Sequence, residues 1–99
     1  MIFNLSRLVG FEWDKGNLGH IKKHGVDYKE CEEIFFNKPL IMFINEEHSV
    51  IEKRYKIFGV TTNRRKLALA ITIRNNKVRV VMARDRNRKE KIKLGGEEI

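Results

Sequence analysis

The sequence predicts a small α+β domain in which two N-terminal helices pack on an antiparallel sheet of about four strands and a short helix follows the sheet. Two capped helical segments lie in the first 40 residues, strand-like runs fill the middle of the chain, and a third capped segment follows the last strand. With 99 residues, of which 41% are hydrophobic, we expect one domain over residues 1–99 with a single core.

The first helix is expected after a short strand. Residues 10–13 alternate large apolar and polar side chains, as a half-buried strand does. Asp14 follows and can cap a weakly amphipathic helix over residues 15–24. Gly25 ends that helix, because glycine readily adopts the left-handed conformation that closes a final helical turn.

The second helix has the clearer start. Asp27 is an N-cap candidate and Glu30 stands three residues later, which is the spacing of a capping box. The helix should cover about residues 28–36, because Pro39 prevents its continuation. Cys31 falls on the buried face, so we expect this single cysteine to be an inert core residue.

Strands follow from residue 40. Residues 40–44 form a short apolar run, and residues 54–62 alternate apolar and polar side chains. Residues 67–74 and 78–83 flank the pair Asn75–Asn76, and because asparagine tolerates positive φ, these two segments are expected to form a β-hairpin. Strands that follow one another in this way predict an antiparallel sheet.

Two further expectations concern the last part of the chain. Asn87 and Glu90 have the spacing of a third capping box, which predicts a short helix over about residues 88–94. In the strand before it, simple alternation places Arg79 and Ala83 on the same face. An arginine beside small or apolar neighbours either reaches from a sheet edge to solvent or lines a cleft.

Charge is distributed unevenly along the chain. Residues 1–50 hold 6 basic and 8 acidic side chains, a net charge of −2, whereas residues 51–99 hold 15 and 5, a net charge of +10. Residues 74–93 alone contribute +7. A field of this kind is typical of nucleic-acid binding, because each neutralised phosphate releases counterions. Alternatively, the same charges would be found on a strand and a helix that face solvent and bind no nucleic acid.

Composition excludes several other classes. The apolar fraction is too high for a disordered chain. The longest aliphatic run, near residues 67–71, is far shorter than the ~20 residues of a membrane-spanning helix. A single cysteine cannot form an internal disulfide, which fits a reducing compartment, so we expect a cytoplasmic protein without a membrane partner.

Two histidines on the first helix are candidates for chemistry. His20 and His24 are four residues apart and could present two imidazoles to one metal ion, but no further ligands cluster near them, so no metal is expected. His24 could stabilise the helix C-terminus as a cation, or it could donate and accept protons beside a basic cleft. His20 is expected to be a packed or partly exposed helix residue.

Several short motifs occur in a fixed order along the chain. They are Phe11-Glu12-Trp13-Asp14 with Asn17, Lys23-His24-Gly25-Val26, His48 with Glu52 and Arg54, Gly59, Arg79, and Ala83-Arg84-Asp85 with Arg88-Lys89-Glu90. In this combination the chain resembles the BrnT toxin family over about residues 11–94. The resemblance implies a RelE-like domain that acts as a ribonuclease and halts translation. It also implies a BrnA-type antitoxin with a ribbon-helix-helix region, through which the toxin reaches operator DNA indirectly.

RNA can be cleaved by attack of the ribose 2′-hydroxyl on the adjacent phosphate, which needs a base, a charge stabiliser and a proton for the departing 5′-oxygen, but no metal or cofactor. Arginine keeps its proton, so Arg79 and Arg84 are predicted to stabilise charge on the phosphate, and Arg54 to position the RNA backbone. His24 is the predicted proton-transfer residue, with Lys23 as the less favoured alternative. The cations expected to hold the RNA are Lys23, Arg74, Lys77, Arg86, Arg88 and Lys89.

Two alternatives remain open from the sequence. The first is a basic module that binds nucleic acid beside a DNA-binding partner and cuts nothing; charge does not separate it from the enzyme, because both use the basic half. The second is a metal-dependent hydrolase built on His20 and His24.

Overall fold

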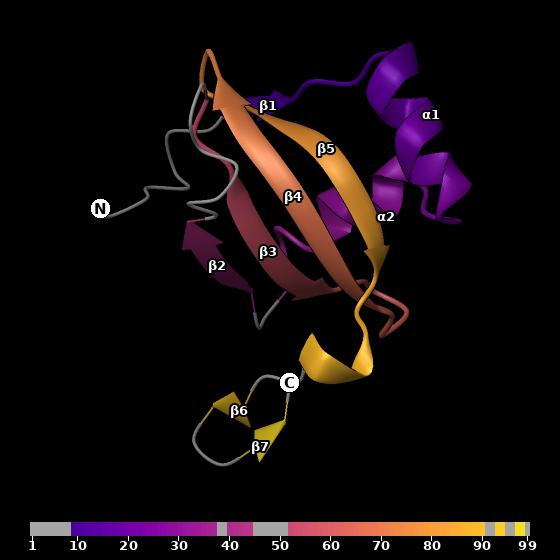
Figure 1. Ribbon diagram of the computed structural model, residues 1–99, viewed down its shortest axis with the longest axis vertical. Helices are drawn as coiled ribbons and strands as arrows, with labels where there is room; N and C mark the ends of the chain where they lie inside the picture. The colour runs from indigo at the N-terminus through magenta and orange to yellow at the C-terminus, as the bar shows by residue number, and fades with distance from the viewer. Residues whose placement is uncertain (1–8, 38–39, 45–51, 91–92, 95–96, 99) are drawn as a thin grey trace.

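Helices α1 and α2 pack on a five-stranded sheet in the computed structural model, which describes residues 9–37, 40–44, 52–90, 93–94 and 97–98 (Figure 1). The elements in chain order are β1 (Gly10–Phe11), α1 (Lys15–Lys23), α2 (Tyr28–Glu33), β2 (Ile41–Ile44), β3 (Tyr55–Val60), β4 (Lys66–Arg74), β5 (Lys77–Asp85), the 3₁₀ helix η3 (Arg88–Glu90), β6 (Lys93–Leu94) and β7 (Glu97–Glu98). Strands β6 and β7 pair with each other in a separate antiparallel sheet.

Both predicted N-terminal helix starts are confirmed. Asp14 caps α1: its Oδ1 accepts the backbone N–H of Asn17 at 3.0 Å, and Asn17 Oδ1 accepts the backbone N–H of Asp14 at 2.7 Å. Asp27 and Glu30 form the predicted capping box of α2. Gly25 follows α1 with a φ of 69°, as its role in ending the helix requires. Helix α2 ends three residues earlier than predicted, at residue 33.

The main sheet has the strand order β1-β5-β4-β3-β2. The predicted hairpin is confirmed, because β4 and β5 are joined by Asn75 and Asn76, whose φ values of 52° and 61° have the sign that a type I′ turn requires. The prediction of a wholly antiparallel sheet of about four strands was wrong. The short strand β1 adds a fifth, parallel to β5, and the backbone N–H of Glu12 donates to the Val78 carbonyl at 2.8 Å beside it. Local alternation predicts that this segment is extended. It does not predict the pairing, because the partner strand β5 lies more than 60 residues away in the sequence.

The predicted C-terminal helix over residues 88–94 was also wrong. The expected local contacts are present: the backbone N–H of Asn87 donates to Glu90 Oε1 at 3.0 Å, and Asn87 Oδ1 accepts the backbone N–H of Lys89 at 2.9 Å. These contacts support one 3₁₀ turn, and Lys93–Leu94 is a strand. Residues 91 and 92 of the predicted helix lie outside the described part of the chain.

A β-bulge in β5 changes which side chains share a face. Consecutive residues of β4 pair with Val80 and with Met82, so Val81 is the extra residue. Because the extra residue shifts the alternation by one position, Ala83 joins Val80 in the core and Met82 falls on the opposite face. The prediction that Arg79 and Ala83 share a face was therefore wrong.

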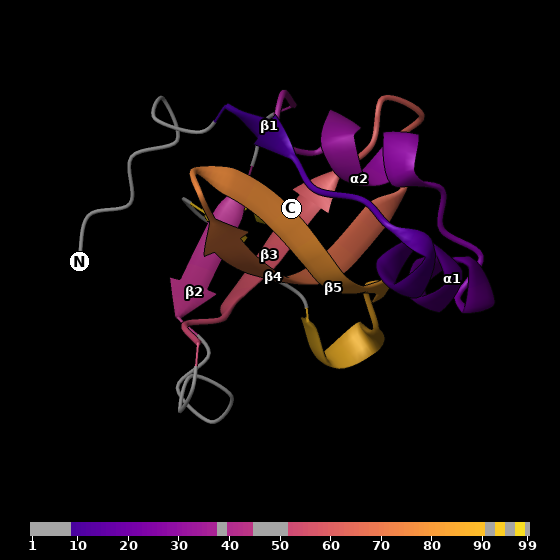
Figure 2. The ribbon, with the colours of Figure 1, turned by 90° about the horizontal axis from the view of Figure 1, so that it is seen from above.

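The two faces of the main sheet differ in character. Figure 2 shows α2 and η3 on opposite sides of the sheet, and we call the face on the side of η3 the outer face. The core lies on the other side, where the fully buried Ile21, Cys31 and Ile34 of the helical region pack against the sheet. Strand register assigns to the outer face Lys56 and Phe58 of β3, Ala68, Ala70 and Thr72 of β4, and Arg79, Met82 and Arg84 of β5. Strand β4 thus presents large residues to the core and small ones to the outer face.

Gly59 allows the end of α2 to approach β3 closely. A Cβ atom on Gly59 would lie 2.8 Å from the Cβ of Ile34, which is too close for a real contact. We expect Gly59→Ala to lower the free energy of unfolding by about 1–3 kcal/mol through overpacking, measured by urea denaturation. Gly19→Ala is the control, because a Cβ there meets nothing within 4 Å and alanine favours the helix. Equal stability of the two variants would contradict the close approach.

Candidate active site

Helix α1 is fixed at its start to the edge of the main sheet. The buried Asn17 donates through Nδ2 to the carbonyl of Glu12 at 2.9 Å. Arg79 of β5 donates through Nη1 to Asp14 Oδ2 at 2.7 Å and to Glu12 Oε1 at 3.0 Å, and this hydrogen bond from Arg79 lowers the pKa of the Asp14 carboxyl. These contacts hold α1 beside β5, as Figure 1 shows, and carry His20 to the border of the outer face.

A cavity of about 330 Å³ lies on the outer face beside α1. It exists because Ala70 is a small residue between two larger cross-strand neighbours, Lys56 on β3 and Met82 on β5. Three lining residues are small or apolar, three are cations and one is a histidine. The lining residues are His20, Arg54, Lys56, Ala70, Val81, Met82 and Arg84. No described carboxylate belongs to this lining, so it suits an anion.

Glu90 of η3 holds two of the cavity's cations from outside the lining. Its Oε1 accepts from Arg84 Nη1 at 2.6 Å, its Oε2 accepts from Arg84 Nη2 at 2.9 Å, and Lys56 Nζ lies 3.1 Å from Oε2. The hydrogen bond from Arg84 is the main reason that the pKa of Glu90 falls to about 2, and the same bond raises the pKa of Arg84. Glu90 therefore stays ionised at neutral pH and orients Arg84 without taking part in proton transfer.

The ion pairs of Glu90 with Arg84 and Lys56 stabilise the fold less as the solution becomes acidic. The pKa of Glu90 is below its usual value in the folded chain, so its contribution is complete above about pH 4.5 and is lost as the pH falls towards 2. We expect Glu90→Gln to lower the free energy of unfolding by about 2–3 kcal/mol at pH 7, and we expect this difference to shrink between pH 5 and pH 2. Urea denaturation across that range measures it. A difference that did not change with pH would contradict the assignment.

Two of the four predicted catalytic residues line the cavity and two do not. Arg54 and Arg84 both line it. Arg79 is on the same face, with a side chain that is 17% exposed and turned to the two carboxylates near β1. His24 is the C-cap of α1 and does not belong to the lining, although its ring centroid is 5.8 Å from that of His20.

The predicted RNA-binding cations fall in three places. They are the end of α1 (Lys23), the hairpin turn (Arg74 and Lys77) and the segment after β5 (Arg86, Arg88 and Lys89). At the hairpin, Arg74 donates to both carboxylate oxygens of Glu52, at 2.7 and 3.0 Å, which lowers the pKa of that carboxyl. The cations at the hairpin turn and those after β5 therefore lie on either side of the cavity along the β4–β5 hairpin.

Two polar residues of the lining, His20 and Lys56, were not among the predicted catalytic or RNA-binding residues; His20 was considered only as a metal ligand or a helix residue. The position of Lys56 could have been read from alternation, because its neighbours Tyr55 and Ile57 are both core residues. His20 could not, because a helix buried along Ile21 can bring either His20 or His24 to a sheet, and the packing angle decides which one.

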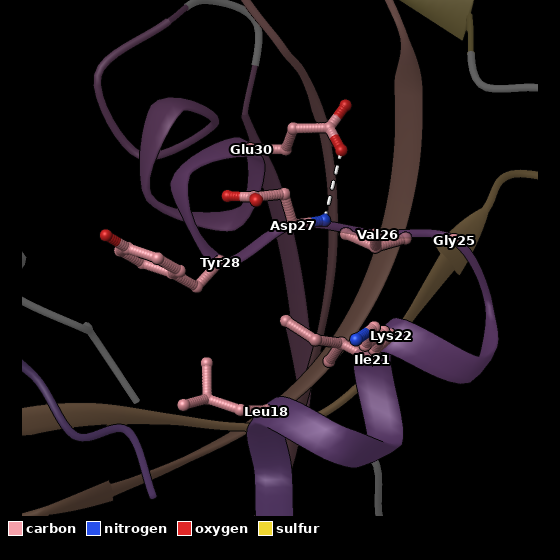
Figure 3. Close-up of a pocket in the computed structure, with 8 residues that line it drawn as sticks. All are labelled: Leu18, Ile21, Lys22, Gly25, Val26, Asp27, Tyr28 and Glu30. Atoms are coloured by element: carbon pink, nitrogen blue, oxygen red, sulfur yellow. Dashed lines mark hydrogen bonds between the residues drawn. The ribbon is translucent and has the colours of Figure 1, made fainter. Parts of the chain in front are cut away.

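A larger cavity, of about 410 Å³, separates α1 from α2 (Figure 3). Leu18 and Ile21 line it on the α1 side and Val26 and Tyr28 on the α2 side, so the lining is largely apolar. Its charged residues are Lys22, Asp27 and Glu30. One cation against two carboxylates gives no positive field, so the cavity on the outer face is the better candidate for an anionic substrate.

The described residues contain neither an accessible thiol nor a metal centre. Cys31 is fully buried, as predicted, and burial raises the pKa of its thiol to about 12, so the nucleophilic thiolate is scarce at neutral pH. In the described ranges, no three or more His, Cys, Asp or Glu side chains are placed to hold a metal ion. No helix in the described part of the chain is long and apolar enough to cross a membrane.

Sequence comparison identifies the family. A family model described as "Ribonuclease toxin, BrnT, of type II toxin-antitoxin system" matches residues 13–90, which include both helices and the whole lining of the outer-face cavity. No curated protein matches the chain. Since the family match covers most of the sequence and confirms the resemblance seen in the motifs, the chain belongs to the BrnT family of ribonuclease toxins of type II toxin-antitoxin systems.

Proposed function

We propose that the protein is a metal-independent endoribonuclease whose active site is the cavity on the outer face. The observation that carries this proposal is the lining: Arg54, Lys56 and Arg84 surround a space that also contains an imidazole, and no described carboxylate lines that space. Three cations attract a phosphodiester, and an imidazole is a side chain that can accept and donate a proton. Membership of a ribonuclease toxin family supports the same reaction class.

The cations suit charge stabilisation, not proton transfer. Attack of the 2′-oxygen on phosphorus forms a cyclic phosphate and breaks the bond to the 5′-oxygen, while negative charge builds on the phosphate. Arg84 can donate to that charge, because its hydrogen bonds to Glu90 and to the Asp85 carbonyl use three of its five N–H groups among the described residues. Arg54 would position the adjacent backbone. Arg79 lies further along the face, where Glu12 and Asp14 hold its Nη1, so it would donate through its other N–H groups.

The RNA strand would run along the hairpin and across the cavity. The proposed contacts are electrostatic and follow the phosphate backbone, which gives affinity without a sequence code. They come from Lys23, Arg74, Lys77, Arg86, Arg88 and Lys89.

The family also implies an antitoxin partner. We propose a BrnA-type antitoxin with a ribbon-helix-helix region, which would bring the toxin to operator DNA. Because the cavity is surrounded by cations, the inhibitory segment would be acidic or would insert a helix over the cavity.

The test uses the purified protein and a long single-stranded RNA, with and without a chelator. We expect cleavage in both conditions, fragments with a 5′-hydroxyl and a 2′,3′-cyclic or 3′-phosphate end, weaker cleavage by Arg54→Gln, and inhibition by the cognate antitoxin. Loss of cleavage in the chelator would favour the hydrolase built on histidines. Salt-sensitive binding that leaves the RNA intact would favour the non-catalytic module.

A further inference from the structure

We infer that His20 is the catalytic proton-transfer residue of the outer-face cavity. This inference rests on the proposed ribonuclease function and goes beyond it, because it selects one of the two imidazoles of α1. His20 lines the cavity and His24 does not. The other polar side chains of the lining are two arginines and one lysine, which remain charged at neutral pH.

Helix geometry explains why the cavity receives His20. Ile21 is 1% exposed and anchors α1 in the core, and the capping contacts of Asp14 and Asn17 fix the start of the helix beside β5. His20 is the neighbour of that anchor and lies at the side where α1 meets the outer face. His24 ends the helix, and its backbone N–H donates to the carbonyl of Ile21 at 3.0 Å.

Cations surround His20 in the cavity. Arg54 and Lys56 face the cavity from the β3 side and Arg84 faces it from β5, while His24 stands one turn away on the same helix. Glu90 is shared by Arg84 and Lys56 and so offsets part of their charge. A neutral imidazole can accept a proton, as the first step of the reaction requires.

The step balances without any further reactant. The neutral imidazole takes the proton of the 2′-hydroxyl as the 2′-oxygen bonds to phosphorus and the bond from phosphorus to the 5′-oxygen breaks. The imidazolium formed in this way then gives the same proton to the departing 5′-oxygen, which leaves a 2′,3′-cyclic phosphate and a 5′-hydroxyl. Arg84 stabilises the charge on the phosphate during the step.

The experiment compares His20→Asn with His24→Asn under single-turnover conditions between pH 5 and pH 9. Both histidines are exposed, so both variants should fold. We expect His20→Asn to cleave RNA at least about 100-fold more slowly, with RNA affinity unchanged, and His24→Asn to stay within about threefold of wild type. The wild-type rate should fall on the acid side as an imidazole becomes protonated, and His20→Asn should lack this acid limb.

Each outcome bears on the inference. Cleavage by His20→Asn at the wild-type rate, or with the acid limb intact, would overturn it. Loss of cleavage in His24→Asn alone would transfer the role to the histidine predicted from the sequence. Failure of the wild-type protein to cleave RNA at any pH would instead refute the proposed function itself, so the two failures are distinguishable.

Discussion

Replacing Arg84 with alanine is expected to lower the single-turnover rate of RNA cleavage by a factor of about 10²–10³. Glu90 holds the guanidinium of Arg84 through two hydrogen bonds, at 2.6 and 2.9 Å, so the donor is already oriented at the cavity wall before RNA binds. A donor held in place beside developing charge is worth more than a mobile one, because it needs no reorganisation during the reaction. Cleavage rates are compared with RNA affinities measured by fluorescence anisotropy.

The Arg84 variant needs a control for charge and one for folding. Arg64→Ala removes the same charge from an exposed turn outside the cavity and should cleave within about threefold of wild type. Arg84→Lys keeps a cation beside Glu90 but loses the planar fork, so it should fold and still cleave slowly. Thermal unfolding of all variants shows whether each is folded at the assay temperature. If Arg84→Ala cleaved as fast as Arg64→Ala, Arg84 would have no part in the reaction.

Replacing Ala70 with leucine is expected to abolish detectable cleavage, a loss of about 100-fold or more, while leaving the fold intact. Ala70 lies in the middle of β4 with its side chain on the outer face, between Lys56 and Met82, and it lines the cavity. A leucine side chain there would occupy the space that the substrate phosphate and ribose need. Because the position is partly exposed, the larger side chain projects into the cavity without overpacking the core.

Ala70→Ser is the matched control for this prediction, since serine is close to alanine in size and leaves the cavity open. It should cleave RNA within a few-fold of wild type. The two variants are compared by single-turnover cleavage and by urea denaturation, with equal midpoints expected. Normal cleavage by a folded Ala70→Leu variant would place the active site elsewhere on the molecule.

Local patterns in the sequence predicted several elements correctly. The capping box of Asp27 and Glu30 and the turn at Asn75 and Asn76 were both confirmed. Each depends on groups within about four residues of one another, so the contacts form whatever the rest of the chain does. The capping pattern at Asn87 and Glu90 was also real, but it supported only one 3₁₀ turn. A cap predicts where a helix begins, whereas its length depends on packing.

The candidate site could be predicted only in part from local patterns. The sequence pointed to Arg54 and Arg84, and the structure brings both to one cavity. It also pointed to His24, whereas the cavity is lined by His20. The residues from Arg79 to Arg84 were placed by alternation, and the bulge at Val81 shifted the second half of that strand by one residue.

The sequence by itself determined the two capped helices, the β4–β5 hairpin, the positive charge of residues 51–99 and the family to which the chain belongs. These follow from short-range contacts, composition and ordered motifs. Only the tertiary structure decided that β1 pairs in parallel with β5, that His20 lines the cavity and that Glu90 pairs with Arg84 and Lys56. Each of these depends on a packing angle or a strand register, which is settled by burial of the whole core and not by neighbours in the chain.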